Sequence, residues 1–194
     1  MARILNSVVL LGVICLATST LAAGCAASSG AGRILSQAST SIEEHNRLLD
    51  RAHATYGRAR REIEAGKASS GDARRRLREA GHLVFRARGR LSEARDKLKQ
   101  VSGMDVAPAV RDYAALLARA TGVQLRAEGD EAKYYRMLEK NTSSGKDSES
   151  ALRLVLRANA EYRRARTLYH RAQRIAASHP RLIPGGTNRR AGIR

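Results

Sequence analysis

Large apolar residues recur at every seventh position along four stretches of this chain. Between residues 72 and 100 each large residue is followed, three positions later, by alanine or valine. The large residues of that stretch are Leu77, Val84, Leu91 and Leu98, and the small ones are Ala80, Ala87, Ala94 and Val101. A seven-residue repeat keeps one face of a helix turned towards a partner helix, and small residues in it favour a close approach.

The other three stretches carry the same repeat. Residues expected to face inwards are Ile42, Leu49, Ala52, Tyr56, Ala59 and Ile63 in the first stretch, Tyr113, Leu116, Ala120, Val123, Ala127, Tyr134 and Met137 in the third, and Val155, Ala158, Tyr162, Ala165, Tyr169, Ala172 and Ala176 in the fourth. Glycine- and serine-rich breaks at 66–71, 102–103 and 141–145 separate the stretches.

The pattern predicts helices at about 41–65, 72–100, 106–140 and 148–178. Short loops make consecutive helices antiparallel, so we expect an all-α, up-down-up-down four-helix bundle with coiled-coil-like packing. Ser39, Thr40 or Ser41 would cap the first helix. Residues 25–40 would form a flexible tether, and residues 179–194, which contain arginines and no acid, a basic disordered tail.

The first 25 residues have the layout of an export signal. Arg3 is their only charge, an apolar run follows at 8–17, and the segment closes with Leu21, Ala22, Ala23, Gly24 and Cys25. Small residues before a cysteine at this distance from the start resemble the lipobox of bacterial lipoproteins.

The resemblance implies lipid transfer to the Cys25 thiol, cleavage after Gly24 and acylation of the new amino terminus. The protein would then be anchored by lipid in a bacterial cell envelope, and Ala26 after the cysteine favours the outer membrane in a Gram-negative cell. Two alternatives stay open: an uncleaved membrane anchor at 4–23, and cleavage by an ordinary signal peptidase near Ala23.

Processing at Cys25 would also remove thiol chemistry from the chain. The sequence has two cysteines, Cys15 and Cys25. Cys15 would leave with the signal and Cys25 would carry the lipid, so no disulfide, thiolate metal site or cysteine nucleophile would remain. The covalent lipid is the only prosthetic group that we expect.

The net charge of the chain is strongly positive, with 36 Lys and Arg against 18 Asp and Glu. Thirty of the basic residues are arginine, which pairs phosphate and carboxylate in a bidentate manner. The candidate anion-binding residues are Arg74, Arg75, Arg76, Arg86, Arg88, Arg90, Arg163, Arg164, Arg166, Arg189 and Arg190. A solvated outer face is the alternative interpretation of these clusters.

Metal binding and catalysis have little support. Glu79 and His82, and Asp50 and His53, have the spacing of bundle metal ligands, but the heptad register turns the first pair outwards and places the second at the flank of the seam or outside it. His45 falls on the inward face without an obvious carboxylate partner, so we expect a capping or partly solvated histidine. Asp130 falls on the seam, where either pairing with an arginine or a local break in the third helix would avoid a buried, unpaired carboxylate.

Three functions are compatible with these features. The first is an envelope lipoprotein that acts as a non-catalytic helical scaffold, spacer or adaptor, with another envelope protein as a candidate partner. The second is an exported module that binds acidic lipid, lipopolysaccharide or cell wall. The third, if the signal is not used, is a basic nucleic-acid-binding protein, although aromatic residues are few, six Tyr and one Phe, and no aromatic stacking platform is evident.

Overall fold

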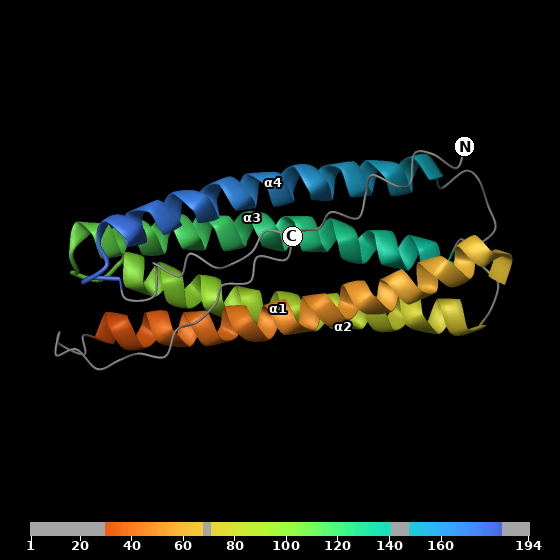
Figure 1. Cartoon of the computed structure of the whole chain (residues 1–194), viewed down its shortest axis with the longest axis horizontal. Helices are drawn as coiled ribbons and strands as arrows, with labels where there is room; N and C mark the ends of the chain where they lie inside the picture. The colour runs from red at the N-terminus through yellow and green to blue at the C-terminus, as the bar shows by residue number, and fades with distance from the viewer. Residues whose placement is uncertain (1–29, 68–70, 141–147, 184–194) are drawn as a thin grey trace.

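A computed structural model describes residues 30–67, 71–140 and 148–183, and within these ranges the chain is an all-α bundle (Figure 1). The elements are α1 (Gly30–Glu62), the short π-helical turn η2 (Ile63–Lys67), α2 (Gly71–Ser102), α3 (Pro108–Lys140) and α4 (Ser148–Ser178). The α-helices have 31 to 33 residues, about 50 Å at 1.5 Å per residue. The predicted all-α four-helix bundle is confirmed.

The tightest packing is between consecutive helices: α1 with α2, α2 with α3, and α3 with α4. All eight inward positions predicted for α2 are buried, and Val84, Ala87 and Leu91 are completely so. Alanine lies at most of the closest contacts: Ala52 of α1 packs in one cluster with Ala80 and Ala87 of α2. The heptad repeat therefore predicted this seam residue by residue.

Helix α1 begins at Gly30, earlier than predicted, so residues 30–40 belong to the bundle and not to a flexible tether. Apolar residues extend the buried face upstream of Ser41, since Ala31 and Ala38 are 2% and 1% exposed. The hydroxyls of Thr40 and Ser41 donate hydrogen bonds to the carbonyls four residues earlier, Ser36 and Gln37. These residues therefore lie inside the helix and do not cap it.

A kink ends α1. Ile63–Lys67 form a π-helical turn in which Gly66 has φ of 78°, a conformation that glycine adopts without the steric cost of a side chain. The first break therefore falls where the sequence predicted it.

The start of the predicted disordered tail is ordered. After α4, the backbone amides of Leu182 and Ile183 donate to the carbonyl of His179. Ile183 is 3% exposed and packs with Ala31, Val110 and Ala176. Burial of this apolar side chain holds 179–183 against the end of the bundle, and 184–194 lie outside the described residues.

Candidate functional site

The residues predicted for lipidation and cleavage, Gly24 and Cys25, lie outside the described part of the chain, as do Arg189 and Arg190 of the predicted anion-binding set. The structure therefore bears on the remaining candidates, which are arginines of α2 and α4 and the polar residues of the interior.

The predicted arginines do not gather in one site. On α2, Arg75 pairs with Asp72, Arg76 pairs with Glu62 of α1, and Arg90 pairs with both Glu44 and Glu93. Arg86 and Arg163 are exposed, and Arg166 is half-buried. Several of these charges are thus neutralised by neighbouring carboxylates, and they are spread over two helices.

Arg88 departs from the outer position expected for it. It is half-buried, and its guanidinium lies 3.6 Å from the point where a side chain at Gly129 would begin. Arg95, one heptad later, lies in the same way over Gly122, at 3.8 Å. Because Gly122 and Gly129 carry no side chain, Arg95 and Arg88 of α2 can lie across α3 at these two positions.

A basic groove is formed where α2, α3 and α4 meet the solvent. Its volume is about 570 Å³, within the usual range for small-molecule sites. Its cationic residues are Arg95, Lys99, Arg119, Arg126, Arg164 and Arg171, and the other residues that line it are Ala118, Gly122, Val123, Thr167 and Leu168. We call this the basic groove. Of its six cations, only Arg164 belongs to the set predicted from sequence.

Three of the groove cations have acidic partners. Arg126 and Arg164 share the carboxylate of Glu161, at 3.2 and 3.3 Å, and Arg95 lies 3.4 Å from Asp96. Lys99, Arg119 and Arg171 have no ion-pair partner among the described residues. The groove therefore holds four positive charges in excess of the carboxylates paired to it.

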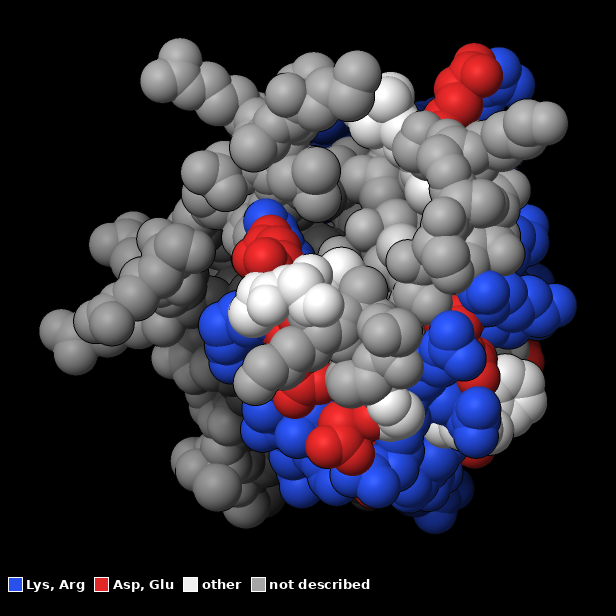
Figure 2. All heavy atoms as spheres, turned by 90° about the vertical axis from the view of Figure 1, so that its right-hand side faces the viewer, with Lys and Arg blue, Asp and Glu red and all other residues white. Residues whose placement is uncertain are grey.

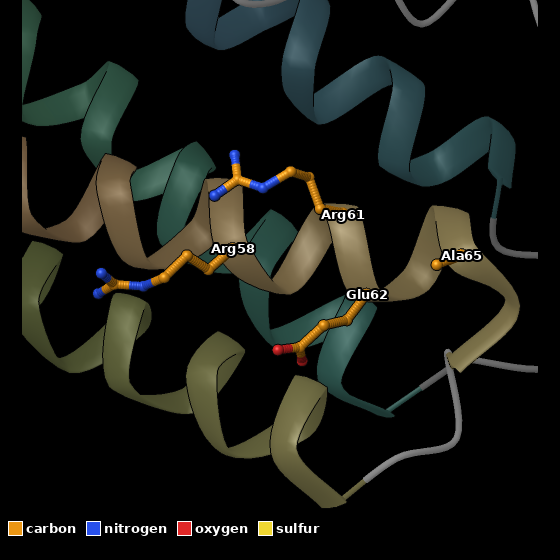
Figure 3. Close-up of a pocket in the computed structure, with 4 residues that line it drawn as sticks. All are labelled: Arg58, Arg61, Glu62 and Ala65. Atoms are coloured by element: carbon orange, nitrogen blue, oxygen red, sulfur yellow. The ribbon is translucent and has the colours of Figure 1, made fainter.

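A second depression lies near the end of α1 and is lined by Arg58, Arg61, Glu62 and Ala65 (Figure 3). All four residues belong to one stretch of chain, and Glu62 is engaged by Arg76. On the bundle end that holds this depression, basic and acidic side chains are interspersed (Figure 2). Two arginines and one glutamate line this depression, a smaller excess of positive charge than that of the basic groove.

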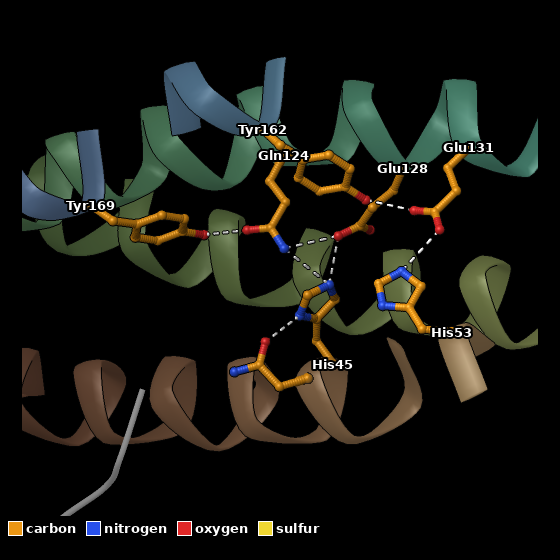
Figure 4. A network of polar contacts seen from close by, with 8 residues as sticks. His45, His53, Gln124, Glu128, Glu131, Tyr162 and Tyr169 are labelled. Carbon is orange, nitrogen blue, oxygen red and sulfur yellow. Dashed lines mark hydrogen bonds and ion pairs between the residues drawn. The ribbon is translucent and has the colours of Figure 1, made fainter. Parts of the chain in front are cut away.

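The interior contains a polar cluster that joins α1, α3 and α4 (Figure 4). His45 is completely buried, and its Nε2 lies 2.7 Å from Oε1 of Glu128, which is also completely buried. The amide of Gln124 donates to the same Glu128 oxygen, and the hydroxyl of Tyr169 donates to Oε1 of Gln124 at 2.8 Å. The expectation of a capping or partly solvated His45 is wrong, because its carboxylate partner comes from a distant helix.

A second buried carboxylate, Glu131, lies one turn further along α3. Its Oε1 is 2.9 Å from Nε2 of His53 and also accepts a hydrogen bond from Tyr135, and its Oε2 accepts one from Tyr162 at 2.6 Å. Three donors from α1, α3 and α4 thus surround one carboxylate. His53 is half-buried against α3, as expected for a flank position.

The electrostatics of this second cluster favour an ion pair. Burial alone lowers the pKa of His53, but the hydrogen bond and negative charge of Glu131 outweigh it and raise the pKa above its usual value. Burial alone raises the pKa of Glu131, but His53 and the two tyrosine hydroxyls outweigh it and lower the pKa. Burial and the Glu131 charge raise the pKa of Tyr135 and Tyr162 well above the usual range, so both hydroxyls remain donors.

Asp130 is not part of the buried seam. It is half-buried beside α4 and pairs with Arg157 at 2.6 Å and with Lys133 at 3.3 Å. The expected pairing with an arginine is confirmed. The carboxylates on the buried face of α3 are Glu128 and Glu131 instead.

Of the candidate metal ligands, Glu79 and His82 lie on the outside of α2, whereas His53 of the other pair contacts Glu131. His82 and Glu79 are exposed, as the register predicted. Within 30–67, 71–140 and 148–183, no three His, Asp, Glu or Cys side chains come together in a way that could hold a metal ion. No helix in these ranges carries an apolar stretch that is long enough to cross a bilayer.

Sequence reasoning missed both buried carboxylates and most of the basic groove. One available signal was the polar character of the α3 seam, where Gln124, Glu128 and Glu131 follow one another at helical spacing. Another was the presence of two histidines on α1 that could face them. No family model, curated protein or solved structure matches this chain.

Proposed function

We propose that this chain is a non-catalytic lipoprotein of a bacterial cell envelope, in which a rigid helical bundle serves as a scaffold, spacer or adaptor. The proposal combines the lipobox-like residues 21–25 with the geometry of the bundle. The observation that carries it is the position at which α1 begins.

Only residues 26–29 separate Cys25 from the first residue of α1, Gly30. A chain spans at most about 3.6 Å per residue, so a lipid on Cys25 would keep this end of the bundle within about 18 Å of its attachment. The helices then extend by about 50 Å. A body of this length on so short a connection would hold a partner at a defined distance from the membrane.

The anchor is tested by growing cells with a fatty-acid probe. The intact chain should take up the label and lose the signal segment, because the Cys25 thiol is the acceptor. Cys25→Ala should abolish labelling and leave uncleaved precursor, whereas the matched variant Cys15→Ala should label normally. Unchanged mass and membrane partition of Cys25→Ala would contradict the proposal.

A second candidate function, the binding of anionic envelope components, is favoured by the uncompensated cations of the basic groove. Such binding would be screened over about 8–10 Å at physiological salt. A chain that starts at residue 26 retains all four helices and should bind acidic vesicles at low salt, with release at roughly a few hundred millimolar salt. Failure to bind acidic vesicles at low salt would leave the scaffold role alone.

A further inference from the structure

We propose that the basic groove is a binding site for a group that carries two phosphates, presented by a lipid headgroup or as a free diphosphate. The inference goes beyond the scaffold role and rests on the candidate anion-binding function, to which it adds a discrete site and a ligand class. Three independent features of the groove support it.

The first feature is the charge balance. The groove has four positive charges in excess of its paired carboxylates, Asp96 and Glu161. A phosphate monoester carries about −1.5 to −2 near neutral pH. Two phosphate groups therefore balance more of the excess charge than one phosphate or one carboxylate would.

The second feature is the convergence of unpaired cations. Lys99 comes from α2, Arg119 from α3 and Arg171 from α4, and all three line the same groove. Each belongs to a different helix, so the packing of the bundle places their backbones around one groove while the side chains stay exposed. The small residues Ala118 and Gly122 line the groove between them, and Arg95 lies over Gly122. Arginine donates paired hydrogen bonds to phosphate oxygens, and lysine supplies a compact charge.

The third feature is the location of the groove. Ala31 of α1 packs with Val101, Val110 and Ala176, so the start of α1 lies beside the end of α2, the start of α3 and the end of α4. Counted from that end, the groove residues Lys99 to Arg126 lie roughly 5–27 Å along the bundle. This is the half in which α1 begins, so a chain anchored through Cys25 would hold the groove near lipid headgroups.

The test uses the lipidated chain purified in neutral detergent, with inorganic pyrophosphate as the probe and calorimetry as the readout. We expect one saturable site per chain. The triple variant Lys99→Gln, Arg119→Gln and Arg171→Gln should weaken binding at least tenfold, because it removes the unpaired cations. The matched control Arg47→Gln, Arg51→Gln and Arg136→Gln removes the same charge from exposed positions outside the groove and should change the affinity less than twofold.

Equal weakening by the two triple variants would overturn the site in favour of diffuse attraction. Absence of pyrophosphate binding would overturn it too, while binding to acidic vesicles would still support the anion-binding function. A single-stranded oligonucleotide is tested as a competitor. If it displaces bound pyrophosphate when its concentration of phosphate groups is below that of pyrophosphate, the diphosphate site is overturned in favour of nucleic-acid binding.

A further arm separates the two ligand sources. The lipidated chain is placed in nanodiscs of neutral lipid, with or without a lipid whose headgroup carries two phosphates. A loss of pyrophosphate affinity in the presence of that lipid supports the site and identifies the headgroup as its ligand. An unchanged affinity supports the site and identifies a free diphosphate.

Discussion

Helices α2 and α3 pack against each other, but their buried faces differ in chemistry. Every residue on the buried face of α2 is apolar, from Ala73 to Val101. The buried face of α3 includes Thr121, Gln124, Glu128 and Glu131. The α2 face needs only shape complementarity, whereas the α3 face needs specific donors, which α1 and α4 supply through His45, Tyr162 and Tyr169 among others.

The difference has an energetic consequence. A buried apolar residue can be exchanged for another of similar volume at modest cost. A buried carboxylate that loses its partner remains desolvated and unpaired, which destabilises the fold more than the pair stabilised it. Glu128 is the more vulnerable of the two, because its Oε2 is buried and has no hydrogen-bond partner among the described residues.

The largest effect is expected where the apolar face receives a charge. Ala87→Glu on α2 should lower the free energy of unfolding by roughly 3–5 kcal/mol, because Ala87 is completely buried in a hydrophobic cluster. Arg86→Glu, on the exposed side of the same helix, is the control and should change it by less than about 1 kcal/mol. Urea unfolding measures both, and equal stabilities would show that the assigned register of α2 is wrong.

The next effect tests whether the polar face depends on pairs. His45→Leu should destabilise the bundle by roughly 3 kcal/mol, because the buried Glu128 would lose its histidine partner and keep only the hydrogen bond from Gln124. The double variant His45→Leu, Glu128→Leu should be more stable than the single variant, since no uncompensated carboxylate remains. If the free energy of unfolding of the double variant falls by the sum of the two single-variant decreases, His45 and Glu128 are not coupled in this way.

A smaller effect should depend on pH. The His53 pKa is raised above 6.5, so its contribution is fully present below that pH and is lost as the pH rises through the folded-state value. The Glu131 pKa is lowered below 4.5, so its contribution is present above that pH and is lost as the pH falls through the folded-state value. The pair should therefore contribute most between about pH 5 and 6.

The comparison of wild type with His53→Gln measures this contribution. The wild type should be more stable by roughly 1–2 kcal/mol at pH 5.5, and the difference should shrink towards pH 8.5. His82→Gln, at an exposed histidine of α2, should show no such profile. If the stability difference between wild type and His53→Gln is the same at both pH values, the His53–Glu131 ion pair does not explain it.

The smallest effect concerns two glycines. Gly81→Ala should stabilise α2 by about 0.5–1 kcal/mol, because alanine is the better helix former and the new methyl group meets nothing within 4 Å. Gly66→Ala should destabilise the chain by about 1 kcal/mol, since Gly66 has φ of 78°. Thermal melting curves should move in opposite directions, and a shift in the same direction would question the kink at η2.

The features that could be predicted from the sequence also differ between the apolar face of α2 and the polar face of α3. The inward positions of α2 and the start and end of α4 at 148 and 178 could be predicted, because they depend on periodicity and on local helix-breaking residues. The start of α1 could not be predicted, because the segment at 39–41, which is rich in hydroxyl residues, resembles a helix cap. It is helical because Ala31 and Ala38, upstream of Ser41, pack against the other helices of the bundle.

The candidate sites were less predictable for a physical reason. Arginine clusters along the sequence suggested sites such as Arg74 to Arg76, but on a helix such neighbours point in different directions and pair with local acids. The basic groove instead combines single cations that lie far apart in the sequence. Only the packing of three helices brings Lys99, Arg119 and Arg171 together.

Most helix bounds, the alanine-lined seam and the excess of positive charge could therefore be predicted, because each depends on spacing or composition within a segment. The packing of the helices sets which carboxylates are buried, which histidine faces each of them, and which cations share a groove. Those outcomes depend on the relative axial positions and rotations of the helices. Contacts such as His45 with Glu128 follow from those positions across 83 residues of chain, and no local pattern encodes them.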